Sequence, residues 1–134
     1  MKEKYPAEVS CPKCGSLIKF DMWTHVDSDL NIEETFALTS GSFFRHICPE
    51  CGAKINIYHS LDFIDPRSKT IINYVQTNEE NQAECIKTYN EIYSREGSGI
   101  KNKLVFTPEE FIECVRRVRF EYSVPAEAAR RAVI

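Results

Sequence analysis

Four of the six cysteines in this 134-residue chain fall in two matching boxes. The first box reads Cys-Pro-Lys-Cys-Gly over residues 11–15, and the second reads Cys-Pro-Glu-Cys-Gly over residues 48–52. Two cysteines separated by two residues can both point at one metal ion across a tight turn, and four thiolates complete the tetrahedral shell of a structural zinc site. The boxes therefore predict one Zn²⁺ ion held by Cys11, Cys14, Cys48 and Cys51.

The residues beside the cysteines have the chemistry of a metal-binding turn. Proline after the first cysteine fixes φ at the start of the turn, and glycine after the second accepts a positive φ. A disulfide within either box would close a very small loop. Iron in a rubredoxin-like site uses the same four thiolates, and spacing does not separate it from zinc. A four-cysteine site leaves no coordination position for a substrate, so we expect it to serve the fold.

Length and composition predict one compact unit that spans residues 5–120, followed by a C-terminal tail or short helix over residues 121–134. With 43% hydrophobic residues the chain can build a modest core. The N-terminus has no apolar leader and no run reaches the length of a membrane span, which predicts a cytoplasmic protein with reduced cysteines and no membrane contact. A formal charge of −3 argues against nonspecific phosphate binding.

The segments around the boxes read as two hairpins joined by a short helix. Partly alternating apolar residues predict a strand over residues 16–23, and residues 43–48 and 54–59 flank the second box in the same way. Asn31 followed by Glu34 resembles a capping box for a helix that ends near residues 40–41. The 33 residues between Cys14 and Cys48 exceed the usual separation of about 15–20 in such sites.

The C-terminal half predicts two further strands and two helices. The strands are expected over residues 70–76 and 104–106, and an amphipathic helix over residues 79–95 is expected to pack and to stop at 97–99. Thr107, Pro108 and Glu110 are a strong helix start. The buried stripe of this last long helix comprises Phe111, Cys114, Val115 and Val118. The fold class is therefore α+β, with zinc-ribbon-like hairpins, an inserted helix and C-terminal helices packed on the sheet.

These residues resemble the CpXC domain, a family of mainly prokaryotic proteins named for its Cys-Pro-x-Cys boxes. The resemblance rests on the two boxes, the long insert, the apolar run over residues 43–47, and the segments 54–58 and 61–65. It spans about residues 5–120. It implies that the four box cysteines are the metal ligands and that the chain is a single mixed α/β unit. It supplies no catalytic residue.

Other reactive side chains have structural interpretations that we favour. Cys85 and Cys114 fall on apolar helix stripes and are expected in the core. His46 alternates with Cys48 on one strand face and could hydrogen-bond a thiolate. His25 and His59 also fall in the ribbon region, far in sequence from either lone cysteine, so a thiol enzyme is only a third choice. The aromatic residues expected to cover the hairpins, with base stacking as the alternative, are Trp23, Phe43, Phe44 and Tyr58.

The functional prediction is a non-catalytic zinc protein that acts as a protein-binding or adaptor module, because no acid, base and nucleophile set converges in the sequence. One alternative is a nucleic-acid reader, since residues 101–134 are net positive. The arginines that would form its basic face are Arg116, Arg117, Arg119, Arg130 and Arg131. The other alternative is a redox or zinc-release sensor built on the thiolates.

Overall fold

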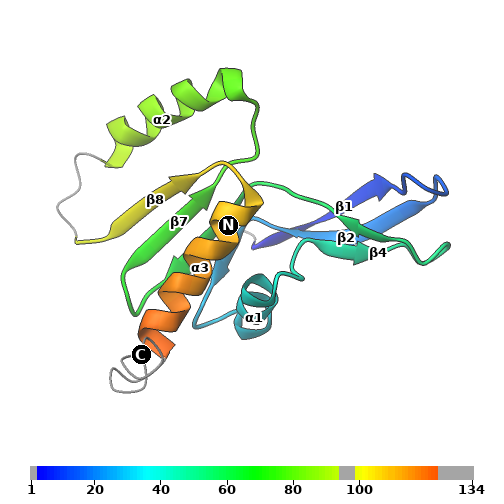
Figure 1. Cartoon of the computed structure of the whole chain (residues 1–134), viewed down its shortest axis with the longest axis horizontal. Coiled ribbons are helices and arrows are strands. Elements are labelled where there is room, and N and C mark those ends of the chain that lie inside the picture. The colour runs from blue at the N-terminus through cyan, green and yellow to red at the C-terminus, as the bar shows by residue number, and fades with distance from the viewer. Residues whose placement is uncertain (1–2, 94–98, 124–134) are drawn as a thin grey trace, which may run out of the picture.

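The computed structural model describes residues 3–93 and 99–123, and its class is α+β (Figure 1). Its elements in chain order are β1 (Lys4–Ser10), β2 (Leu17–Trp23), β3 (His25–Asp27), α1 (Ile32–Ser40), β4 (Arg45–Ile47), β5 (Lys54–Asn56), β6 (Leu61–Asp65), β7 (Thr70–Tyr74), α2 (Glu79–Tyr93), β8 (Lys101–Val105) and α3 (Pro108–Ser123). No helix among the described residues is both long and apolar enough to span a bilayer. The division of the chain at residue 120 stays a prediction.

Two antiparallel hairpins form an extension that we call the ribbon arm (β1, β2, β4 and β5). In the first hairpin β1 pairs with β2 from Lys4 opposite Trp23 to Ser10 opposite Leu17, and in the second β4 pairs with β5. Figure 1 shows β1, β2 and β4 projecting to one side of the remaining elements. The predicted hairpins and the helix between them are confirmed. The second hairpin is shorter than expected, because β5 ends at Asn56.

The body of the molecule is a mixed four-stranded sheet in the order β3-β6-β7-β8. β6 and β7 are antiparallel, whereas β3 pairs with β6 and β7 pairs with β8 in parallel. β1, β3 and β6 were not predicted as strands from the sequence. β8 begins at Lys101, three residues before the predicted strand, since its first residues are polar and its pairing with β7 is not local in sequence.

The main core lies between this sheet and the two helices α1 and α3. α3 begins as predicted, with the Glu110 amide donating to the Thr107 hydroxyl at 3.2 Å. The ring of Phe111 on α3 stacks on Tyr74 of β7 at a centroid distance of 5.5 Å. The buried cluster consists of Val26, Leu38, Phe44, Leu61, Phe63, Ile72, Tyr74, Val105, Phe111, Cys114 and Val115. The predicted stripe of α3 and the core position of Cys114 are thus confirmed.

Two helix predictions need correction. α1 ends at Gly41 as predicted, with φ +83°, but the side chain of Asn31 makes no capping hydrogen bond to the helix. Its Oδ1 instead accepts the amide of Asp27, which tightens the turn before the helix. α2 packs on β8, as expected, although none of its described side chains is fully buried. Cys85 on α2 is half-buried and lies outside the core.

Residues 97–98 of the predicted helix stop and residues 124–134 of the predicted tail lie outside the described residues, whereas residues 121–123 of that tail belong to α3. Gly99, the last residue of that stop, has φ +76°, a backbone conformation that glycine adopts without strain.

Asp65 at the end of β6 is a fully buried carboxylate that links three parts of the body. It accepts hydrogen bonds from the hydroxyl of Ser28 after β3 and from the hydroxyl and amide of Ser68 in the β6–β7 turn. Arg119 of α3 approaches it at 3.4 Å. Burial acts to raise the pKa of Asp65, but these hydrogen bonds and the Arg119 charge together hold it below its usual range.

We expect Asp65→Asn to lower the free energy of unfolding by about 3 kcal/mol at pH 7, because buried donors and a cation lose their charged acceptor. A lowered native-state pKa stabilises the fold above the unfolded carboxyl pKa of about 3.9 and stops doing so as pH falls through the native value. The difference between wild type and variant should therefore shrink below about pH 4. Urea unfolding over a pH series measures it.

The matched control is Asp29→Asn, which removes a carboxylate from an exposed ion pair with Arg67 at 3.4 Å. This substitution should lower the free energy of unfolding by less than about 1 kcal/mol. A loss for Asp65→Asn that is equally small, or that does not change with pH, would contradict the role of this carboxylate.

Candidate metal centre

The two boxes fold into two equivalent knuckles at the tips of the ribbon-arm hairpins. In the first, the Cys11 amide donates to Ser16 and the Gly15 amide donates to the Cys11 carbonyl, both at 2.8 Å. In the second, Cys48 and Gly52 make the corresponding bonds, each at 2.9 Å. Gly15 and Gly52 have φ values of +79° and +73°, which confirms why glycine follows the second cysteine of each box.

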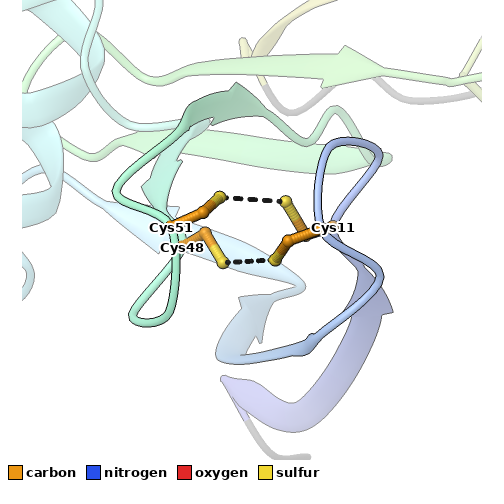
Figure 2. A group of neighbouring side chains, drawn as sticks. Cys11, Cys48 and Cys51 are labelled. Atoms are coloured by element: carbon orange, nitrogen blue, oxygen red, sulfur yellow. Dashed lines mark hydrogen bonds between the residues drawn. The ribbon is translucent and has the colours of Figure 1, made fainter.

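The knuckles bring the four predicted cysteines together. The Sγ atoms of Cys11 and Cys51 are 3.6 Å apart, as are those of Cys14 and Cys48, so each short contact crosses from one knuckle to the other. All four Sγ atoms lie within 4.8 Å of one another. Figure 2 shows Cys11 facing Cys48 and Cys51 across the gap between the hairpins.

This arrangement fits a tetrahedral metal ion. A Zn–S bond of about 2.3 Å places the sulfur atoms at tetrahedral corners about 3.8 Å apart. The two observed Sγ–Sγ distances of 3.6 Å lie close to that edge length. Because all four Sγ atoms lie within 4.8 Å of one another, they would have to move only slightly closer together to bind one ion. Four sulfur donors also match the preference of zinc and of iron for soft ligands. The site is therefore compatible with metal binding, and its geometry does not distinguish the two metals.

Burial divides the four candidate ligands into an inner and an outer pair. Cys11 and Cys48, the first cysteines of the boxes, are buried with Ile18 in a small cluster, while Cys14 and Cys51 are exposed. The partly buried residues that complete this cluster are Val9, Ala53 and Ile55. The inner cysteines thus serve as core residues of the ribbon arm as well as candidate ligands.

Backbone amides and one hydroxyl are positioned to stabilise thiolates at the site. A hydrogen bond from the Cys14 amide is the main cause that lowers the pKa of Cys11. The Ser16 hydroxyl and then its amide lower the pKa of Cys14 to about 6. The Ala53 amide acts in the same direction on Cys51, but desolvation and hydrogen bonds with the other thiols outweigh it and raise its pKa to about 11. A bound cation would displace the thiol protons of these four cysteines and hold all four as thiolates.

The described hydrogen bonds and ring contacts of the three histidines involve no thiol. The His46 ring packs against Phe20 at a centroid distance of 4.6 Å, and no hydrogen bond from it to a thiol is found among the described residues. The proposed contact of His46 with a thiolate is therefore not observed. His25 faces the hydroxyl of Thr24 at 3.1 Å, and His59 lies 3.0 Å from the carbonyl of Ser60.

The aromatic residues expected to cover the hairpins lie closer to the body. Phe44 is buried in the main core, and Trp23 and Phe43 pack against it. Tyr58 is 39% exposed and lies 5.3 Å from Phe44 between ring centroids. Three of the four therefore join the arm to the sheet instead of covering the hairpins alone.

The arginines of α3 do not form one free basic face. The Nε of Arg116 donates to the carbonyl of Thr39 at 2.7 Å, and Arg119 pairs with the buried Asp65. Arg117 forms an exposed pair with Glu113 one turn earlier at 3.4 Å. Arg130 and Arg131 lie outside the described residues. Two of the three described arginines thus hold α3 in place, which weakens the case for a nucleic-acid reader.

Cobalt titration tests the four-thiol assignment. The reduced apoprotein should bind one Co²⁺ and develop the visible and thiolate charge-transfer bands of a tetrahedral cobalt thiolate, because four sulfurs surround one position. Cys48→Ser should weaken or abolish these bands. Cys85→Ser is the matched control, since Cys85 lies on α2, and it should leave the spectrum unchanged. An unaltered spectrum for Cys48→Ser would contradict the assignment.

Comparison with known proteins gives one match, to a family model. Neither a search of curated proteins nor a search of solved structures gives a match. The family model described as CpXC protein matches residues 9–124, which contain both knuckles and the elements from β2 to α3. Since this match covers most of the chain, the protein belongs to the CpXC family.

Proposed function

We propose that this protein binds one Zn²⁺ ion through Cys11, Cys14, Cys48 and Cys51, that the ion is structural, and that the protein acts as a non-catalytic binding or adaptor module. The observation that carries the metal proposal is the convergence of four Sγ atoms within 4.8 Å from two equivalent knuckles. Zinc is the usual ion of closed four-cysteine knuckles. A site of reduced thiols also agrees with a cytoplasmic location, which is part of the proposal.

The small core of the ribbon arm supports a structural role for the metal. Only Cys11, Ile18 and Cys48 are buried in its cluster, whereas the body has a continuous core of eleven buried residues. Two-stranded hairpins are marginal in water without further packing. Metal binding, which contributes roughly 10–16 kcal/mol of apparent free energy in zinc-finger peptides, would supply the missing stabilisation.

An exposed apolar surface on α1 and the turn before it supports the binding role. Leu30, Ile32 and Phe36 are 75%, 71% and 73% exposed, although each carries a large apolar side chain. Ile32 and Phe36 are four residues apart and therefore share one face of the helix, while Thr35 and Leu38 face the core. Exposed apolar groups that gather on one element are typical of protein interaction sites. We propose that this α1 face contacts the partner protein.

The redox alternative also has some structural support. Cys14 and Cys51 are exposed, so an oxidant can reach them, and each lies 3.6 Å from a buried cysteine of the other knuckle. Retention of the metal under mild peroxide would count against a sensor.

Metal removal should unfold the arm before the body. After chelation, amides of β1, β2, β4 and β5 should lose protection from hydrogen exchange, because this part has little core of its own. Amides of β6, β7 and α3 should keep most of theirs, since they surround the main core. Hydrogen exchange followed by mass spectrometry on holo and chelated protein measures the difference. Unchanged protection in the arm would contradict a structural metal.

Partner capture should depend on the α1 face. A protein captured from cell extract by the wild-type chain should be lost with Ile32→Ser, Phe36→Ser, because the apolar contact surface is removed. The matched control is Ile86→Ser, Ile92→Ser, which changes two exposed isoleucines of α2. If both double variants capture the protein equally well, or if both lose it, the proposed α1 contact is contradicted.

A further inference from the structure

A cavity of about 310 Å³ lies between α3 and the β7–β8 side of the sheet. Its lining combines three cationic side chains, Lys101, Lys103 and Arg117, with the apolar Ile72, Cys114 and Val118. The volume is near the lower end for small-molecule pockets, which run from about 300 to 1,000 Å³. This cavity is separate from the four cysteines and has no part in the proposed metal site.

The cavity exists because α3 leaves the edge strand partly uncovered. α3 packs chiefly on β7, and β8 is an edge of the four-stranded sheet. Lys103 pairs in register with Ile72, a buried core residue, and Lys101 pairs with Thr70. Residues in register share a face of the sheet, so both lysines stand on the α3 side, where apolar residues would otherwise continue the core.

The charges around the cavity favour an anion. Lys101 and Lys103 form no ion pair with any residue in the described ranges 3–93 and 99–123, and Arg117 has only its exposed pair with Glu113. Three cations therefore gather at one cavity in a chain whose net charge is −3. Guanidinium and ammonium groups together are well suited to a carboxylate or phosphate.

We propose that this cavity binds a small organic anion. Its oxyanion group, a carboxylate or a phosphate, pairs with Lys101, Lys103 and Arg117, and its apolar portion rests on Ile72, Cys114 and Val118. The competing explanation is that the lysines only prevent edge-to-edge pairing of β8, a common use of lysine on edge strands.

The test uses the full-length, metal-loaded protein and three probes with the same six-carbon chain: hexyl phosphate, hexanoate and hexylammonium. Amide resonances of β8 and α3 are followed by NMR during titration. At least one anion should shift these resonances saturably, and hexylammonium should not. The tighter of the two anions identifies the group that the site prefers.

Lys101→Gln, Lys103→Gln should weaken anion binding about tenfold or more, because two charge-assisted contacts are lost. The matched control, Lys19→Gln, Lys87→Gln, makes the same change in net charge on β2 and α2 and should bind like the wild type. The proposal is overturned if neither anion shifts these resonances, if hexylammonium binds as well, or if the β8 variant keeps its affinity. Self-association of that variant without anion binding by the wild type would establish the edge-pairing explanation instead.

Discussion

Hydrophobic burial alone is too small to stabilise the ribbon arm, and this constraint explains most features of the arm. Its cluster buries one aliphatic side chain, Ile18, together with two cysteines that are also candidate ligands. The knuckles therefore have to be shaped by local turn chemistry and held together across the hairpins by the thiols. Amide and hydroxyl donors around Cys11 and Cys14 favour the thiolate forms that a metal requires. In this account the metal stabilises an element that two-stranded pairing would leave marginal.

The arm is connected to the body by continuous backbone pairing and by aromatic packing. β2 leads through Thr24 into β3, and the Thr24 carbonyl accepts the amide of Asp62 on β6. Phe44 lies between the second hairpin and the main core, where its ring meets Tyr74 at a centroid distance of 6.0 Å. Contacts formed between the thiols can therefore also stabilise the sheet through this hydrogen bond and this ring contact. At the other end of β6, Asp65 joins the sheet to α3 through Arg119.

The features that the sequence predicted are those with local causes. The knuckle turns, the glycine after α1 and the threonine before α3 each depend on a few neighbouring residues, and the structure confirms them. β3 was missed because it has only three residues and pairs in parallel with a strand far along the chain. β6 was missed although it is as long as the predicted β7 and pairs with it across a tight turn. Cys85 on α2 was predicted in the core but is half-buried, since an apolar stripe indicates a helix face but not how closely another surface covers it. The cationic cavity has no sequence signature, because β8 and α3 meet only in the fold.

The central claim is that the four knuckle cysteines hold a structural zinc ion. Elemental analysis of the purified protein by plasma mass spectrometry tests it most directly, with the wild type measured beside the Cys11→Ser, Cys14→Ser double variant. The account predicts one zinc per chain in the wild type and none in the variant. Iron in place of zinc, a wild type without metal, or zinc retained by the variant would contradict it.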